Sequence, residues 1–235
     1  LNFDDDKLAT IKEVKGKTPV FISYADKNTY AYVDNTVDTG IEGTRCIINV
    51  NGDDVEVNVP LPGKHMVLNA LTACAIGSIC GVSTNEMKQG IEKLEPVGGR
   101  VNIIKTNKYT LIDDCYNANP VSMKASIDVL TYATGRKVAI LGDMFELGND
   151  EKALHGSIGS HIANTTVDVL ISIGELSLNI DEHARTNGYA GEIVHFNTLE
   201  EFMQSYSNIL IEGDTVLVKA SHGMHLEKII NSLTE

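Results

Sequence analysis

After residue 100 the chain alternates short apolar segments with segments of helical length. The apolar runs predict strands at 101–104, 110–112, 138–141, 169–173, 193–196 and 215–218. Helices are expected near 121–133, 150–163, 176–186, 198–210 and 224–234. Strands separated by helices of this length favour right-handed βαβ units and a parallel sheet covered on both faces. This half of the chain is therefore predicted to be an α/β, doubly wound, mostly parallel Rossmann-like sheet.

The first part of the chain has a different pattern, with strands and turns followed by two helices. One strand is expected at 19–24, and a hairpin is expected where 44–50 and 55–59 flank Asn51-Gly52, a pair that favours tight turns between strands. Small apolar residues predict a helix at 67–79, and the capping-box sequence at 83–86 predicts a second helix ending near residue 94. Pro96 to Gly99 then breaks the pattern, so we expect domains at 1–97 and 98–235.

Composition excludes several classes of protein. A formal charge of −13 argues against nucleic-acid binding, and no apolar run approaches the roughly 20 residues of a membrane span. The N-terminus lacks the basic and apolar regions of a signal peptide. Cys46, Cys74, Cys80 and Cys115 form no metal-binding pair, and Cys74 and Cys80 are expected as core thiols. We therefore expect a cytoplasmic protein with no membrane partner and no structural metal.

Polar residues follow the expected strand at 110–112. The segment Asp113-Asp114-Cys115-Tyr116-Asn117-Ala118-Asn119-Pro120 leads directly into a helix. Helix capping explains Asn119 and Pro120, but it leaves the carboxylates, Tyr116 and Asn117 without a role. Because ligands bind at the carboxyl ends of strands in open α/β sheets, we interpret this segment as a binding loop.

Two further loops are expected at the same edge of the sheet. The acidic loop Gly142 to Gly148 follows one strand and is expected to face a ligand, while His155 beyond it caps or packs. In the other loop, Lys219 and Ser221 can bind a carboxylate, although a lysine at a strand end is more often a solvated charge. Three such loops at one edge favour a shared site.

Two candidates precede this sheet. Asn69 lies in an apolar helical stretch and needs a hydrogen-bond partner, either a purine edge or a nearby loop backbone. Arg100 follows two glycines and is either an exposed interdomain residue or a phosphate ligand. The chain contains no GxxxxGK[ST] phosphate loop.

Together these segments resemble the Mur ligases of peptidoglycan synthesis, most closely the members that add D-alanyl-D-alanine to UDP-N-acetylmuramoyl tripeptide. The resemblance rests on segments in the family's order: Asn2-x-Asp4-Asp5, Gly63 to Ala70, Gly99-Arg100, Asp114 to Pro120 and Gly142 to Gly148. It implies the later part of an ATP-binding central domain followed by the C-terminal Rossmann-like domain.

The resemblance also implies a reaction: ATP phosphorylates the tripeptide carboxylate, and the dipeptide amine attacks the acyl phosphate. It assigns the nucleotide to Asn69, Arg100, Asp114 and Tyr116, and the dipeptide to Asn117, Asn119, Lys219 and Ser221. The phosphate loop, the Mg²⁺ ligands and the family's carbamoylated lysine would lie upstream. We therefore expect no catalytic residue in this chain, no turnover by it alone, and a monomer.

Three residues depart from the family pattern. Met66 replaces an Asn near the nucleotide, while Ala220 and His222 replace a Gly and an Arg, which would make anion binding weaker or pH-dependent. The alternatives are a sister ligase that adds one amino acid, the more distant folylpolyglutamate synthase, and a non-catalytic nucleotide-binding module. The Tyr-Asn-Ala-Asn-Pro turn disfavours the first two, and the acidic Gly142 to Gly148 loop and the absence of an Asp-Asn-Pro-Arg segment further disfavour the sister ligase.

Overall fold

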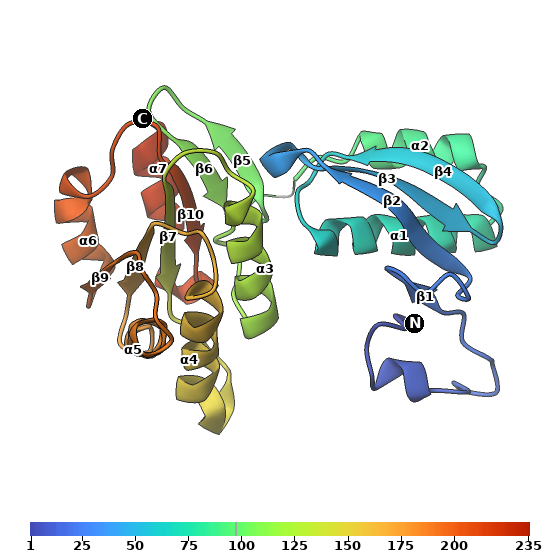
Figure 1. Ribbon diagram of the computed structural model, residues 1–235, viewed down its shortest axis with the longest axis horizontal. Helices are drawn as coiled ribbons and strands as arrows, with labels where there is room; N and C mark the ends of the chain where they lie inside the picture. The colour runs from blue at the N-terminus through green and yellow to red at the C-terminus, as the bar shows by residue number, and fades with distance from the viewer. Residues whose placement is uncertain (97) are drawn as a thin grey trace. The chain divides into compact units, whose positions relative to one another are not determined.

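A computed structural model describes residues 1–96 and 98–235. The chain divides into two compact units, Leu1–Glu95 and Pro96–Glu235, each with its own sheet (Figure 1).

The first unit is built on a four-stranded sheet with the order β1-β2-β3-β4. Its strands are β1 (Ile22–Ser23), β2 (Ala31–Asp38), β3 (Thr44–Val50) and β4 (Asp53–Val59). β1 is parallel to β2, whereas β2, β3 and β4 pair antiparallel. Between β3 and β4, Asn51 and Gly52 have φ values of 52° and 95°, as a type I′ turn requires. The predicted hairpin is confirmed.

The other two strands of this sheet, β1 and β2, differ from the prediction. The strand expected at 19–24 is reduced to Ile22–Ser23, and β2 was not predicted. β2 contains a bulge between Asp34 and Thr36, where Asn35 has a φ of 46°. The extra residue breaks the alternation of apolar and polar positions on which strand prediction depends.

Two helices, α1 (Lys64–Ile79) and α2 (Thr84–Glu92), complete the first unit. α1 packs on β1, β2, β3 and β4, and α2 packs on β4 and on α1. The predicted capping box is present, because Glu86 N–H donates to Ser83 Oγ while the Glu86 carboxylate accepts from Ser83 N–H. Cys74 is buried as expected, but Cys80 is exposed. The expectation for Cys80 was wrong because α1 ends at Ile79, one residue earlier.

The second unit is a six-stranded sheet with the order β5-β6-β10-β7-β8-β9. Its strands are β5 (Asn102–Lys105), β6 (Thr110–Asp113), β7 (Lys137–Gly142), β8 (Val169–Ile173), β9 (Glu192–Phe196) and β10 (Thr215–Lys219). The edge strand β5 runs antiparallel to β6, and the other pairs are parallel. The predicted mostly parallel α/β sheet is confirmed.

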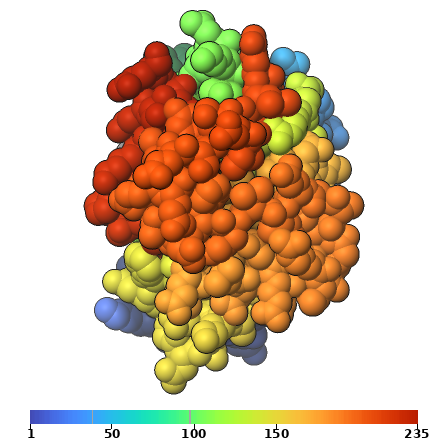
Figure 2. All heavy atoms as spheres, turned by 90° about the vertical axis from the view of Figure 1, so that its left-hand side faces the viewer, coloured from blue at the N-terminus to red at the C-terminus, as the bar shows by residue number. Residues whose placement is uncertain are grey.

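Helices cover both faces of this sheet. They are α3 (Pro120–Thr131), α4 (Glu151–Ile162), α5 (Leu178–Thr186), α6 (Leu199–Ser205) and α7 (Glu227–Thr234). Figure 1 shows α3 and α4 on one face and α6 and α7 on the other. In Figure 2 the orange segments, near residues 170–210, form a convex surface over the β8 and β9 side of the unit. No helix in the described part of the chain is long and apolar enough to cross a membrane.

The last two helices are shorter than expected. α6 ends at Ser205 and continues only as a 3₁₀ turn at Tyr206–Asn208. α7 begins at Glu227, after a separate 3₁₀ turn at His222–Met224 and a left-handed residue, His225. Further 3₁₀ turns lie at Leu8–Thr10, Gly40–Glu42 and Gly148–Asp150.

The strand order places β10 between β6 and β7. The carboxyl ends of these three parallel strands therefore meet at one edge of the sheet. The chain leaves β6 toward α3 and leaves β10 toward α7, on opposite faces (Figure 1). A change of face between neighbouring strands is the arrangement that creates a ligand crevice in open α/β sheets.

Candidate functional site

The three loops that the sequence analysis selected follow β6, β7 and β10, and hydrogen bonds join them. We call them the edge loops: 114–119, 143–147 and 220–223. Phe145 N–H donates to Ser221 Oγ at 2.8 Å, and Ser221 N–H donates to the Asp143 carbonyl at 3.0 Å. Asp114 N–H donates to the Val218 carbonyl at 3.1 Å. Ser221 is buried, so its hydroxyl connects two loops within the protein.

Beneath the edge loops lies a buried ion pair between Asp114 and Lys219. Lys219 Nζ donates to Asp114 Oδ2 at 2.6 Å, and the Ser126 hydroxyl on α3 donates to the same oxygen. Val101 N–H donates to Asp114 Oδ1 at 3.2 Å. Lys219 is only 2% exposed, so the alternative of a solvated lysine was wrong. Asp114 and Lys219 lie 105 positions apart, and only the strand order brings them together.

The Lys219 ammonium is fully used within the protein. Besides Asp114 Oδ2 it donates to the Asn117 carbonyl at 2.9 Å and weakly to the Asp114 carbonyl at 3.5 Å. An ammonium has three N–H donors, so these acceptors account for all of them. Lys219 therefore holds the turn after β6 in place.

The turn above this pair presents amide groups to solvent. Asn119 caps α3 by accepting from Ser122 N–H at 2.9 Å, while its own N–H donates to Ser122 Oγ at 3.1 Å. Asn117 Oδ1 accepts from Ala118 N–H at 2.9 Å. Both asparagines are exposed, and their Nδ2 groups donate to no residue that the structure describes. These donors are available to a ligand.

Arg100 packs against the same turn. Its guanidinium carbon lies 4.2 Å from the centre of the Tyr116 ring, and Tyr116 N–H donates to the Gly99 carbonyl at 2.9 Å. Gly99 has a φ of 70°, and a Cβ there would lie 3.1 Å from the Tyr116 nitrogen. Glycine is therefore required at this close approach. The structure brings these two predicted nucleotide-binding residues together.

The acidic loop after β7 is held in place by hydrogen bonds to buried residues of the same unit. Met144 N–H donates to Nε2 of the buried His155 at 2.8 Å, so the ring's proton lies on Nδ1 and is donated to the Glu151 carbonyl at 2.7 Å. Asp143 Oδ1 accepts from Ser177 N–H at 2.8 Å, and burial raises the pKa of Asp143. Asp143 thus faces the β8–α5 connection, which leaves the exposed Glu146 as the carboxylate of this loop in contact with solvent.

Asn69 belongs to the first unit and lies on the exposed side of α1. Its Nδ2 lies 3.7 Å from Met66 Sδ. The premise that Asn69 is buried and needs a partner was wrong, because the apolar residues around it in sequence cover a different face of the helix. In the same unit the Asp4 carboxylate accepts from Ser23 Oγ and from Tyr24 N–H, and so fixes the end of β1.

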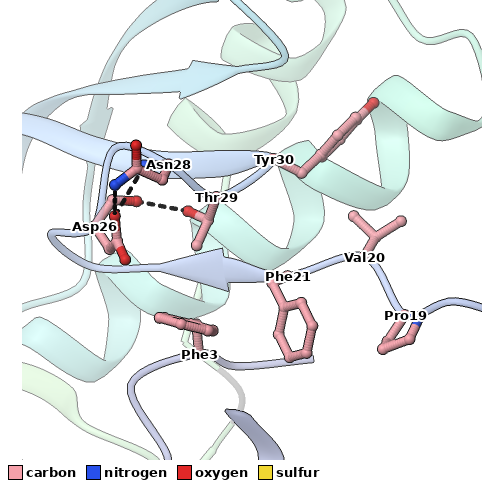
Figure 3. A pocket seen from close by; sticks show the side chains of 8 residues that line it. All are labelled: Phe3, Pro19, Val20, Phe21, Asp26, Asn28, Thr29 and Tyr30. Carbon is pink, nitrogen blue, oxygen red and sulfur yellow. Dashed lines mark hydrogen bonds between the residues drawn. The ribbon is translucent and has the colours of Figure 1, made fainter. Parts of the chain in front are cut away.

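A cavity of about 350 Å³ lies in the first unit (Figure 3). It is lined by Phe3, Pro19, Val20, Phe21, Asp26, Asn28, Thr29 and Tyr30. The Phe3 and Phe21 rings meet edge to face at 5.4 Å. None of the predicted site residues lines it. The described residues hold no cluster of three or more His, Cys, Asp or Glu side chains suited to a metal ion.

Comparison with known proteins identifies the family. Residues 99–222 match the family described as Mur ligase, glutamate ligase domain, and residues 1–77 match the Mur ligase middle domain. The chain belongs to the Mur ligase family.

Several relatives carry the name UDP-N-acetylmuramoyl-tripeptide–D-alanyl-D-alanine ligase, and two of them illustrate the similarity. The Bacillus subtilis protein is 34% identical over 197 residues, covering 83% of this chain and 43% of the relative. The Escherichia coli protein is 29% identical over 238 residues, covering 100% and 51%. A crystal structure of MurF from Acinetobacter baumannii has a TM-score of 0.85 at 26% identity, covering 100% of this chain and 51% of that one. The chain spans about half the length of the relatives it matches.

Two parts of the site were not predicted from the sequence. Ser126 and the Val101 backbone both donate to Asp114, yet neither belongs to a polar loop. Ser126 lies four residues after Ser122 on α3, hence on the same face of the helix as the cap. The four-residue spacing between Ser122 and Ser126 could have indicated that Ser126 faces the site. No feature of the sequence near Val101 indicated that its N–H donates to Asp114.

Proposed function

We propose that this chain serves the ATP-dependent joining of D-alanyl-D-alanine to UDP-N-acetylmuramoyl tripeptide. The observation that carries the proposal is the exposed amide turn at 116–119, held over the buried Lys219–Asp114 pair. That arrangement presents hydrogen-bond donors at the edge where α/β sheets bind ligands. The names of the Bacillus subtilis and Escherichia coli relatives supply the substrates.

The proposed chemistry has two steps. The tripeptide carboxylate attacks the γ-phosphorus of ATP, which forms an acyl phosphate and releases ADP. The dipeptide amine then attacks the carbonyl carbon, so that an amide bond forms, the C–O bond to phosphate breaks, and phosphate and a proton leave. Phosphoryl transfer depends mainly on positioning and on neutralising charge, and these are the tasks that we assign to this chain.

We assign nucleotide binding to four residues: Asn69, Arg100, Asp114 and Tyr116. Arg100 is exposed and, among the described residues, pairs with no carboxylate, so its guanidinium is available to a phosphate. Asp114 Oδ2 is occupied by Lys219 and Ser126, while Oδ1 accepts from a single donor, Val101 N–H, among the residues that the structure describes. The remaining lone pair of Oδ1 suits a ribose hydroxyl. The exposed amide of Asn69 suits an adenine edge.

We assign dipeptide binding to three residues: Asn117, Asn119 and Ser221. The free Nδ2 groups of the two asparagines can donate to its carboxylate or its carbonyl. Lys219 takes a positioning role in place of direct contact, because its donors are used within the protein. We assign no metal ligand and no catalytic residue to the described residues, and propose that this chain alone binds ligands without turnover.

We also propose a monomer that works in the cytoplasm with small-molecule partners and without nucleic acid or membrane. The described cysteines are all free thiols, which suits a reducing compartment. The net charge of −13 opposes association with nucleic acid.

Calorimetric titration of the chain with D-alanyl-D-alanine and with ADP tests this function. Asn117→Ala should weaken dipeptide binding by about tenfold, as the loss of a hydrogen bond to a charged group predicts. Asn119→Ser should weaken dipeptide binding while keeping the α3 cap, because serine also caps helices. Asn231→Ala, exposed on α7, is the control. Unchanged dipeptide affinity in both test variants would show that the amide turn does not bind the dipeptide.

A further inference from the structure

The carboxylate of Glu146 lies in the loop after β7, at the carboxyl edge of the second sheet. The residue is exposed, and among the residues that the structure describes its side chain forms no ion pair and no hydrogen bond. The other acid of this loop, Asp143, is buried and accepts from Ser177 N–H at 2.8 Å. Glu146 is therefore the acid of the loop 143–147 that a ligand can reach.

The backbone at Glu146 has a conformation that glutamate seldom adopts. Its φ is 63°, in the left-handed region that glycine enters without strain and a residue with a Cβ does not. Two residues later the chain does place a glycine in this region, because Gly148 has a φ of 69°. An exposed side chain at a strained position contributes little to packing. Strained positions of this kind cluster at functional sites.

Hydrogen bonds fix the residues that lead up to Glu146. Met144 N–H donates to Nε2 of the buried His155 at 2.8 Å, and Phe145 N–H donates to Ser221 Oγ at 2.8 Å. The first bond joins the loop to α4, and the second joins it to the loop after β10. Glu146 is therefore held beside the loop after β10 before any ligand arrives.

The turn after β6 offers groups of the opposite kind. Asn117 and Asn119 carry exposed Nδ2 donors, whereas Glu146 carries an acceptor. Because β10 lies between β6 and β7, two strand spacings, about 10 Å, separate this turn from the loop after β7. An extended dipeptide spans about 7 Å, and a hydrogen bond at each end adds about 3 Å. A dipeptide is therefore long enough to contact both segments at once.

We propose that Glu146 binds the amine of the incoming dipeptide and is a specificity-determining residue for the acceptor. The inference rests on the function proposed above, because that function supplies a ligand with an amine at one end and a carboxylate at the other. The Glu146 carboxylate accepts a hydrogen bond from the amine, and the charge on the acceptor strengthens this bond. A ligand without the amine loses the contact with Glu146 and keeps its contacts with the amide turn.

Calorimetric titration of the chain with two ligands tests the amine contact. One ligand is D-alanyl-D-alanine, and the other is propanoyl-D-alanine, which has a hydrogen in place of the amine and keeps the carboxylate. The test variant is Glu146→Gln, which keeps the size of the side chain and removes its charge. The matched control is Glu175→Gln, because Glu175 is exposed in the loop after β8, one strand further from the amide turn.

We expect the unchanged chain to bind D-alanyl-D-alanine about tenfold tighter than propanoyl-D-alanine, as one hydrogen bond to a charged group predicts. Glu146→Gln should lose about tenfold in affinity for D-alanyl-D-alanine and keep its affinity for propanoyl-D-alanine. Glu175→Gln should keep both affinities. An equal loss for the two ligands in Glu146→Gln, or no loss for either, would overturn the amine contact.

Glu146→Gly separates ligand binding from stability. Glycine relieves the strain of the left-handed backbone, so this variant should unfold at a temperature no lower than that of the unchanged chain. Its affinity for D-alanyl-D-alanine should nevertheless fall as it does in Glu146→Gln. A clearly lower unfolding temperature would assign Glu146 a structural role and would overturn the proposal.

Asn117→Ala in the same titrations distinguishes this failure from failure of the proposed function. Weaker dipeptide binding in Asn117→Ala, with no selective loss in Glu146→Gln, keeps the dipeptide site and overturns the contact between Glu146 and the amine. Absence of dipeptide binding by the unchanged chain overturns both.

Discussion

At the scale of single residues, the site depends on charges that are buried and paired. Asp114 and Lys219 lose their contacts with water when the protein folds. Hydrogen bonds to each other, to Ser126 and to the backbone of the turn replace those contacts. Such pairs add little net stability, but removing one partner leaves the other charge buried without compensation. The pair therefore fixes the shape of the turn that carries Tyr116 and Asn117.

Lys219→Met should lower the free energy of unfolding by about 3–5 kcal/mol, because it leaves the Asp114 carboxylate buried without its cation. Urea denaturation followed by circular dichroism measures the change. Lys228→Met, on the exposed side of α7, should change stability by less than about 0.5 kcal/mol. A loss below about 1 kcal/mol in Lys219→Met would show that the pair does not hold the fold at this point.

Asp143 gives the protein a defined dependence of stability on pH. Burial raises its pKa in the folded state, so the unfolded chain loses this proton first as pH rises above about 4. Within that window the folded state binds more protons, and stability falls with rising pH until the folded carboxyl has also ionised.

Asp143→Asn removes this ionisation and keeps an oxygen that can accept from Ser177 N–H. The stability of the variant relative to the wild type should therefore increase from about pH 4 upward and then level off. Urea denaturation over a pH series tests this, with the exposed Glu192→Gln as the reference. A difference that is constant across the series would contradict the burial argument.

The sequence predicted which loops carry the candidate site better than it predicted the surroundings of each residue. The polar loop residues were selected because they follow apolar strands, and the structure does place the three loops at one edge. The burial of Lys219 and the exposure of Asn69 were not predictable in this way. The first depends on a partner 105 positions away, and the second on which side of α1 meets the sheet.

At the scale of elements, the close approach of α4 and α5 shapes one face of the second sheet. A Cβ at Gly159 would lie 2.0 Å from the Ile180 carbonyl oxygen and 2.8 Å from the Ala184 nitrogen. Both atoms belong to the backbone of α5, so no side-chain rotation can relieve the clash. Glycine at position 159 is what allows the two helices to pack at this distance.

Gly159→Ala should destabilise the protein by about 1–3 kcal/mol through overpacking. Gly90→Ala is the matched variant, because Gly90 also lies inside a helix but a Cβ there meets nothing within 4 Å. Alanine at position 90 should stabilise by about 0.4–1 kcal/mol. Thermal unfolding of the two variants measures both signs, and destabilisation by both would show that helix packing is not the cause.

Elements with continuous apolar runs could be predicted closely, and irregular ones could not. The runs at 138–141, 169–173 and 215–218 became the central strands β7, β8 and β10, buried on both faces. β2 was not predicted because its bulge at Asn35 interrupts the alternation of apolar and polar residues. The antiparallel direction of β5 follows from its short connection to β6 through residues 106–109, which the residue pattern alone did not resolve.

At the scale of the whole molecule, the two units have separate hydrophobic cores. One core lies between α1, α2 and the four-stranded sheet, and the other lies between α6, α7 and the face of the second sheet formed by β6, β7, β8 and β10. The candidate residues are divided between them, with Asn69 in the first unit and the edge loops in the second. The proposed ligand contacts of this chain therefore form two separate sets, one on each unit.

Phosphate release tests the central claim most directly. It is measured with a chain extended to the full length of its relatives, given ATP, Mg²⁺ and UDP-N-acetylmuramoyl tripeptide, with either D-alanyl-D-alanine or single amino acids as the acceptor. The account predicts release that requires the dipeptide and falls by about tenfold in Asn117→Ala. Release that requires a single amino acid would assign the protein to a sister ligase. No release with any acceptor would leave only a nucleotide-binding module, and either result would contradict the account.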